Sequence, residues 1–250
     1  MTKLSGTILD GVSRPEGRGA GTGPRNYWLV MPAAGVGRRF GADRPKQYAP
    51  LCGRTVIEWA LAPFLTDARC SGAVVALAED DPYWAAIAPP TVLVISGGEE
   101  RSHSVRNGLR ALAVRAGRDD WVLVHDAARP CLPRQDLDRL LTDLAAHPVG
   151  GILATPAADT LKRADAARQI EQTVDRAGLW RALTPQMFRY GRLCEALDRA
   201  HGSGRVPTDE AQAIEWLGDR PALIEGAAAN LKITSAADLA LAAALLKEPR

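Results

Sequence analysis

Apolar runs and amphipathic patterns alternate along the chain from residue 27 onward. Short apolar runs bounded by polar residues predict buried β-strands. We expect these strands over 27–33, 73–78, 91–96, 121–127 and 151–156. Helical spacing of apolar residues predicts helices over 55–65, 104–116 and 134–147. Because the two kinds of element alternate, the pattern predicts an α/β fold, with a mostly parallel, twisted sheet flanked by helices on both faces.

The alternation breaks at 157–190. Two short segments, 159–165 and 169–175, alternate in polarity and are joined by the polar turn AAR. This pattern predicts a β-hairpin outside the main sheet, an arm at about 157–180. An isolated hairpin is only marginally stable, so we expect the arm to pack on another surface, for which a second copy of the chain is the natural candidate. Helical patterns then return over 191–202, 208–218 and 235–248.

The composition is that of a globular protein that folds without disulfides or metals. The chain has 250 residues, of which 46% are hydrophobic and 24% charged, an ordinary balance for a chain of this size. We expect a single domain over 26–250. Residues 1–25 are rich in glycine, arginine and proline and have no periodicity. We interpret them as a disordered leader or the result of a start codon assigned too early, with a basic tail that meets nucleic acid as the alternative.

Charge and cysteine usage narrow the class of partner. The formal net charge is +2, so no global field favours nucleic acid, and any affinity for anions must be local. No apolar run approaches the roughly 18–20 residues that a membrane span needs. The four cysteines form no CxxC or Cys/His cluster, which suits a reducing compartment. We therefore expect a cytoplasmic protein that binds neither nucleic acid nor membrane.

The loop after the first predicted strand carries the strongest local signal. The stretch 31–51 reads MPAAGVGRRFGADRPKQYAPL. Gly35 and Gly37 allow a tight turn and the close approach of backbone to a ligand, and successive backbone N–H groups at a strand-to-helix turn form an anion site. Arg39 and Lys46 would add fixed positive charge. The stretch favours phosphate binding over the alternative, solvated cations beside an ordinary turn.

Two familiar nucleotide motifs fit this loop poorly. The spacing G-x-G-x-x-F imitates a dinucleotide-binding fingerprint, but the third glycine is missing and GADRPKQY interrupts the expected helix. No G-K-[ST] follows, so the loop is not a Walker A motif.

Two further loops follow predicted strands, where ligands of parallel sheets bind. In SGGEERSHS, Gly97, Gly98 and Ser104 offer little bulk and exposed donors, which suits a flat base or a ribose, although a helix N-cap explains them too. In HDAARP, Asp126 closes a strand. Its carboxylate could hold Mg²⁺, which prefers oxygen ligands, or cap a turn. His125 is favoured as a packed strand residue rather than a base.

Seven stretches that occur in a fixed order indicate a protein family far more specifically than any one of them does. AAGVGRRFGADRPKQY, SGGEERSHSV and HDAARP are followed by DTLKR, LWRALTPQ, PTDEAQAIEWLG and NLKITSAADLALA. From about Tyr27 to the C-terminus, the chain resembles the 2-C-methyl-D-erythritol 4-phosphate cytidylyltransferases of the non-mevalonate isoprenoid pathway. The resemblance implies a Rossmann-like nucleotidyltransferase fold with a protruding β-hairpin dimerisation arm.

The family's activity and partners follow from the same resemblance. It implies a homodimeric enzyme that joins CMP from CTP to methylerythritol phosphate and releases pyrophosphate, with Mg²⁺ or another divalent cation. Arg39, Lys46 and Lys232 would be the catalytic cations, with Lys232 reaching the α-phosphate. The residues that would line the nucleotide are Ala33, Ala34, Gly35, Gly37, Gly97, Gly98, Ser104, Asp126 and Ala127.

The implied acceptor site draws on the arm. Thr160 and Arg176 lie where the family's arm touches methylerythritol phosphate in the neighbouring subunit, and Thr184 is close to that site. Asp126 would meet the ribose, the metal or the acceptor, and the metal would be held mostly by the CTP phosphates. Each of these residues alone is a weak signal.

One position differs from the family's usual pattern, and three alternative functions are considered beside the resemblance. His103 stands where the family often has an acidic residue or glutamine, which bears on contacts to the base. Ribitol-5-phosphate cytidylyltransferases share the fold, but they tend to have LAGG-like and HDSVRP-like loops, whereas PAAG and HDAARP here favour methylerythritol phosphate. A non-catalytic nucleotide-binding module and an NAD-dependent oxidoreductase are alternatives from other classes.

Overall fold

A computed structural model describes residues 26–35 and 44–247. The predicted leader, residues 1–25, lies outside these described residues, as do 36–43 and 248–250.

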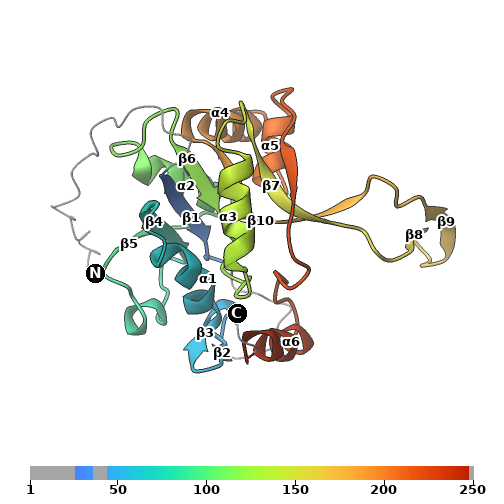
Figure 1. The fold of residues 1–250 in the computed structure, drawn as a ribbon, viewed down its shortest axis with the longest axis horizontal. Coiled ribbons are helices and arrows are strands. Elements are labelled where there is room, and N and C mark those ends of the chain that lie inside the picture. The colour runs from blue at the N-terminus through green and yellow to red at the C-terminus, as the bar shows by residue number, and fades with distance from the viewer. Residues whose placement is uncertain (1–25, 36–43, 248–250) are drawn as a thin grey trace.

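Seven strands form the main sheet, in the order β11-β7-β10-β6-β1-β4-β5 (Figure 1). Their bounds are β1 Tyr27–Pro32, β4 Cys70–Leu77, β5 Val92–Ser96, β6 Trp121–Val124, β7 Gly150–Pro156, β10 Trp180–Arg189 and β11 Ala222–Glu225. β10 runs antiparallel to both of its neighbours, β6 and β7, whereas the other neighbouring strands pair in parallel. The five strands predicted from apolar runs are present, and the mostly parallel sheet is confirmed.

Two strands of the main sheet, β10 and β11, are not predicted by the sequence pattern, and β10 is the more informative of them. It contains Pro185, and proline is usually absent from central strands because it cannot donate a hydrogen bond to the ladder. The structure accommodates it where the pairing of β10 with β7 shifts register between Ala182 and Gln186. On either side of this irregularity the strand pairs normally, so β10 fills the middle of the sheet despite its sequence.

Helices cover both faces of the sheet, as predicted. They are α1 Val56–Leu65, α2 Arg101–Leu112, α3 Arg134–Asp143, α4 Tyr190–Gly202, α5 Glu210–Glu215 and α6 Ala236–Lys247, with short 3₁₀ helices η1 Lys46–Tyr48 and η2 Trp84–Ala86. Alternation along β1 separates two cores, because Leu29 and Met31 pack with α1 and α3, whereas Val30 packs with α2, α4 and α5. Within the described ranges, no helix is long and apolar enough to cross a membrane.

A third, smaller core lies beside the sheet. The strands β2 Pro50–Leu51 and β3 Arg54–Thr55 form a two-stranded ribbon. Leu51 packs there with Ile233 and with Ala242 of α6. This core fixes the chain on both sides of Lys232, which precedes α6 in sequence.

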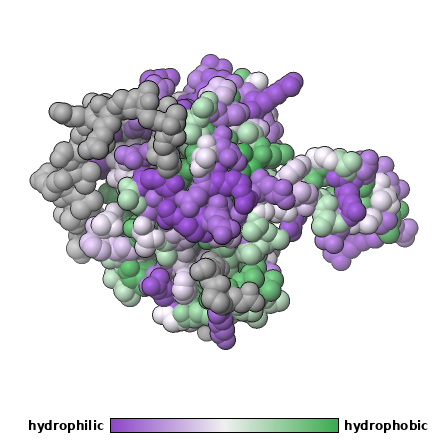
Figure 2. All heavy atoms as spheres, viewed as in Figure 1, coloured by the Kyte–Doolittle hydropathy of each residue, from purple (hydrophilic) through white to green (hydrophobic). Residues whose placement is uncertain are grey.

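The predicted hairpin is present as a separate two-stranded sheet. β8 Leu161–Ala164 and β9 Ile170–Val174 pair in antiparallel fashion and project from the body where β7 ends and β10 begins (Figure 1). All of β8 and nearly all of β9 is exposed. Figure 2 shows this arm as a separate lobe on which apolar and polar residues lie side by side. The packing of the arm on a second copy stays a prediction.

Candidate functional site

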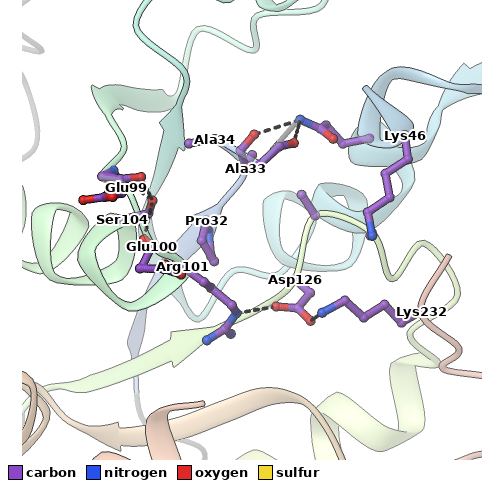
Figure 3. A pocket seen from close by; sticks show the side chains of 15 residues that line it. Pro32, Ala33, Ala34, Lys46, Glu99, Glu100, Arg101, Ser104, Asp126 and Lys232 are labelled. Atoms are coloured by element: carbon purple, nitrogen blue, oxygen red, sulfur yellow. Dashed lines mark hydrogen bonds and ion pairs between the residues drawn. The ribbon is translucent and has the colours of Figure 1, made fainter. Parts of the chain in front are cut away.

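A cleft opens where β1, β5 and β6 end (Figure 3). Parallel strands place their carboxyl ends at one edge of a sheet, so the loops that follow them meet there. The cleft is lined by Pro32, Ala33, Ala34, Gly35, Lys46, Gln47, Gly98, Glu99, Glu100, Arg101, Ser104, Asp126, Ala127, Ala128 and Lys232. The structure therefore brings together loops that the sequence analysis had singled out one by one.

Gln47 ties the loop after β1 to η1. Its side-chain amide donates to the carbonyl oxygens of Ala33, at 2.8 Å, and Gly35, at 3.2 Å. Gln47 is buried, so these bonds hold its neighbour Lys46 at the mouth of the cleft. Figure 3 shows the Lys46 side chain reaching from η1 toward the loop that carries Asp126. Sequence reasoning assigned no role to Gln47, because a glutamine beside a lysine carries no pattern of its own.

The two glycines after β5 are required by close packing. A Cβ atom on Gly97 would lie 2.4 Å from the Cβ of Ala34, and one on Gly98 would lie 2.4 Å from the Cβ of His103. The Gly98 N–H donates to Ser104 Oγ at 3.0 Å. The loop is thus a thin wall whose backbone borders the cleft. Gly98 and Ser104 line the cleft itself, whereas Gly97 lies against Ala34.

Asp126 is the electrostatic centre of the cleft. Its Oδ1 accepts from Arg101 Nε at 2.9 Å, and its Oδ2 accepts from Lys232 Nζ at 2.8 Å. Arg129 Nε lies 3.7 Å from Oδ2. Burial of this carboxyl, which is 7% exposed, would raise its pKa, but the charges of Arg101 and Lys232 outweigh burial and hold the pKa of Asp126 well below its usual range. Asp126 is therefore ionised at neutral pH.

Arg101 and Glu210 form an ion pair that sequence reasoning missed. Two nitrogens of the Arg101 guanidinium donate to the two carboxylate oxygens of Glu210, at 2.7 and 3.0 Å. Glu210 is fully buried. The two residues lie 109 positions apart in sequence, and no local pattern connects them. They meet because α2 and α5, which they begin, pack on the same face of the sheet beside the Asp126 loop.

His125 and Thr184 lie behind Asp126 and act as its support. His125 is fully buried, and burial lowers its pKa to about 4, so the ring is neutral at neutral pH. Its Nε2 lies 3.1 Å from the Arg129 carbonyl, so Nε2 carries the proton, and Nδ1 accepts from Thr184 Oγ1 at 2.9 Å. The Thr184 oxygen in turn accepts from the Asp126 N–H at 3.1 Å. The expectation that His125 is a packed residue agrees with this arrangement.

The remaining predicted residues divide into two groups. Gly37 and Arg39 lie outside the described residues. Thr160 and Arg176 lie on the exposed arm, where the Arg176 guanidinium contacts the Ala158 carbonyl. Neither is among the lining residues of the cleft in the same chain, and Figure 1 shows the arm projecting away from the body of the molecule.

The donor set does not fit a metal ion held by the protein alone. Over the part of the chain that the structure describes, no group of three or more histidine, cysteine, aspartate and glutamate side chains could hold a metal. Both oxygens of Asp126 are paired with cations. A divalent ion at this edge of the sheet therefore needs most of its ligands from the substrate.

A parallel sheet edge with a thin glycine wall, two lysines and a clamped carboxylate is suited to a nucleotide with its phosphates. The fold and the cleft define an α/β enzyme of the nucleotidyltransferase class. Residues 27–248 match the family model of IspD, 2-C-methyl-D-erythritol 4-phosphate cytidylyltransferase. The chain belongs to this family, and the resemblance seen in its sequence motifs is confirmed.

Individual relatives agree with the family match. A curated 2-C-methyl-D-erythritol 4-phosphate cytidylyltransferase of Ectopseudomonas mendocina is 57% identical over 218 residues, which are 86% of this chain and 93% of the relative. One from Pseudomonas aeruginosa is 57% identical over 217 residues, covering 85% and 93% of the two chains. Among solved structures, a 4-diphosphocytidyl-2C-methyl-D-erythritol synthase is 41% identical with a TM-score of 0.77, covering 89% of this chain and 99% of its own. The Francisella tularensis cytidylyltransferase is 35% identical with a TM-score of 0.77, at 88% and 99% coverage.

Proposed function

We propose that this chain transfers CMP from CTP to 2-C-methyl-D-erythritol 4-phosphate, giving 4-diphosphocytidyl-2-C-methyl-D-erythritol and pyrophosphate. The observation that carries the proposal is the family match over residues 27–248, on a chain whose cleft gathers Lys46, Lys232 and Asp126 at one sheet edge. The enzyme would work in the cytoplasm as a single domain over 26–250, in the supply of isoprenoid precursors.

The reaction is an in-line displacement at the α-phosphorus of CTP. A phosphate oxygen of the acceptor attacks, the bond from the α-phosphorus to the bridging oxygen breaks, and pyrophosphate leaves. A phosphate monoester is nucleophilic at neutral pH without a strong base, so the difficulty is to bring two polyanions together. Catalysis is then mainly positioning and neutralisation of charge. The neutral, buried His125 is consistent with this, because it is not placed to act as a base.

The cations of the cleft supply that neutralisation. Lys46 and Arg39 would hold the CTP phosphates, and Lys232 would serve the α-phosphate, where charge develops in the transition state. Asp126 orients Lys232 through their 2.8 Å contact. Mg²⁺, when bound, would add further neutralisation of phosphate charge and would be held mainly by the CTP phosphates.

The thin wall after β5 would bind the cytosine. Gly97 and Gly98 have no room for side chains beside Ala34 and His103, and a flat base needs such a surface. Ser104 fixes the wall by accepting from the Gly98 N–H. The loop after β1, Ala33 to Gly35 and Gly37, together with Ala127, would complete the nucleotide pocket.

The acceptor site would be shared between two copies of the chain. The support for this is the arm, whose strands are exposed and have no core of their own. We place Thr160 and Arg176 of one subunit over the cleft of the other, with Arg176 on the acceptor phosphate, which suits a guanidinium. Thr184 would act on the same site through its bond to the Asp126 N–H.

The activity is tested by incubating the protein with CTP, Mg²⁺ and either methylerythritol phosphate or ribitol 5-phosphate, and measuring pyrophosphate. We expect pyrophosphate to be released with methylerythritol phosphate as the acceptor and not with ribitol 5-phosphate. Release with ribitol 5-phosphate alone would transfer the assignment to that acceptor, and nucleotide binding without pyrophosphate in either case would indicate a non-catalytic module.

The shared site is tested by complementation in trans. Arg176→Ala and Lys46→Ala chains, each nearly inactive, are mixed so that subunits exchange. Mixed dimers would hold one intact site of two, so activity should recover to about a quarter of wild type when the chains are equal in amount. A mixture of Lys46→Ala with Lys232→Ala is the matched control, because both defects lie in the nucleotide half and no intact site can form. If exchange is shown by mass and the first mixture stays as inactive as the control, the shared site is wrong.

A further inference from the structure

The guanidinium of Arg101 has a partner on each of its three nitrogens. Nε donates to Asp126 Oδ1 at 2.9 Å, and the two terminal nitrogens donate to Glu210 at 2.7 and 3.0 Å. Figure 3 shows the row that results, with Asp126 between Arg101 and Lys232. Glu210 takes up both terminal nitrogens of the guanidinium, a pair that could otherwise bind a phosphate in bidentate fashion. Arg101 therefore borders the nucleotide cleft with its terminal nitrogens turned to another residue.

Glu210 is itself held in place by the sheet. It is the first residue of α5 and is fully buried. The start of α5 is joined to β10 through Gln186, which accepts from the Ala211 N–H at 2.9 Å and donates to Asp209 at 2.9 Å. Burial raises the pKa of Glu210, and the charge of Arg101 opposes that rise. The buried carboxylate therefore depends on the charge of Arg101 for its ionised form.

We propose that Glu210 is a positioning residue of the transfer reaction: it holds Arg101 so that Arg101 clamps one oxygen of Asp126, leaving the other for Lys232. The inference rests on the proposed function and deepens it. Glu210 also keeps the guanidinium from binding the CTP phosphates in an unproductive way. Glu210→Gln removes the negative charge and one of the two acceptor oxygens that face Arg101, which makes the cleft more positive, so the nucleotide would still bind. Asp126 and Lys232 would lose their alignment, and the chemical step would slow.

The proposal predicts that Glu210→Gln changes kcat and the KM for CTP differently. We expect kcat to fall by about 10- to 100-fold, the cost of a misplaced catalytic group, while the KM for CTP does not rise. A residue that merely supports the fold would loosen the cleft, so that KM for CTP rises as the melting temperature falls. Glu215→Gln is the matched control, because Glu215 is the exposed last residue of α5, and it should keep both constants.

A double variant separates positioning from folding. Removal of one partner of a buried ion pair leaves an unpaired charge, whereas removal of both is often tolerated. In Arg101→Gln with Glu210→Gln, the melting temperature should recover toward wild type, yet kcat should stay at least about tenfold low because Asp126 has lost its clamp. Recovery of kcat together with stability would overturn the proposal, as would a wild-type kcat in Glu210→Gln. If the single variant does not fold, the double variant decides.

Failure of the role proposed for Glu210 can be distinguished from failure of the proposed function. Pyrophosphate release by the wild type tests the function, and the ratio of variant to wild type tests the inference. Should the wild type release none, calorimetric binding of CTP still tests the inference. Glu210→Gln is expected to bind CTP at least as tightly as wild type, and binding weakened by about tenfold or more would overturn the role given to Arg101.

Discussion

In the cleft, the charged side chains around Asp126 are held in place by ion pairs and hydrogen bonds. On the arm, by contrast, the strands β8 and β9 are exposed along almost their whole length. Asp126 is clamped by Arg101 and Lys232 and supported from behind by Thr184. On the arm, Lys162 Nζ donates to Thr173 Oγ1 in an exposed position. The difference teaches where each part can act. The cleft is organised within one chain, whereas the exposed strands of the arm have almost no buried surface within it, and under the proposed function they act on a second copy of the chain.

The largest expected effect is on turnover, in the cleft. Lys46→Ala and Arg39→Ala should each lower kcat by about two to three powers of ten, because a preorganised charge at the transition state is worth roughly 3–4 kcal/mol. The melting temperature should stay near that of wild type. Lys247→Ala, at the exposed end of α6, is the control and should keep full turnover. Turnover within about threefold of wild type in Lys46→Ala or Arg39→Ala would remove that residue from the catalytic group.

The next effect is on stability as the pH falls. His125 is neutral in the folded state, with a pKa of about 4 against an ordinary value of 6.5. The unfolded chain therefore binds its proton first, and stability should be lost as the pH falls from about 6.5 to about 4. The shift corresponds to roughly 3 kcal/mol of the free energy of unfolding.

Urea unfolding of wild type and His125→Asn at several pH values measures the His125 contribution, because subtraction removes the carboxyl groups that titrate in both proteins. The variant should be destabilised at pH 7 but should lose less stability on acidification. Parallel pH profiles would show that His125 is not the group responsible.

Thr184→Val should have a smaller effect, again in the cleft. The substitution keeps the shape but leaves the buried Asp126 N–H and His125 Nδ1 without their shared partner. An unsatisfied buried group costs about 1–3 kcal/mol, so chemical unfolding should show a loss of this size. Unchanged stability would mean that water replaces the hydroxyl.

Thr173→Val is the same substitution on the arm and should have the smallest effect. Its hydroxyl accepts from Lys162 at the surface, and surface substitutions of this kind change stability by within about 0.5 kcal/mol. Chemical unfolding of the two variants compares the stability lost when a buried hydroxyl, that of Thr184, is removed with the stability lost when an exposed one, that of Thr173, is removed. A loss at Thr173 as large as that at Thr184 would contradict the prediction and show that the Thr173 hydroxyl is not at the surface in solution.

The parts of the fold that follow from local patterns could be predicted from the sequence. Apolar runs such as that of β6 are strands because the whole run is buried, and the hairpin of β8 and β9 follows from alternation around a short polar turn. β10 could not be predicted in this way. Its Pro185 is typical of a break, and only pairing with β7 on both sides of the irregularity, and with β6 beyond it, makes the segment a strand.

The same division holds for the site. The sequence by itself determined which loops follow strands, and hence that Ala33 to Gly35, Gly98, Ser104 and Asp126 meet at one sheet edge, whereas Lys232 was added by the family resemblance. It also determined the family, because seven motifs in order are specific even where each is weak. Only the tertiary structure decided how the charges are paired. Arg101 meets Glu210 across 109 positions, since the partner of a buried charge is set by the packing of distant elements and leaves no trace in the spacing of neighbouring residues.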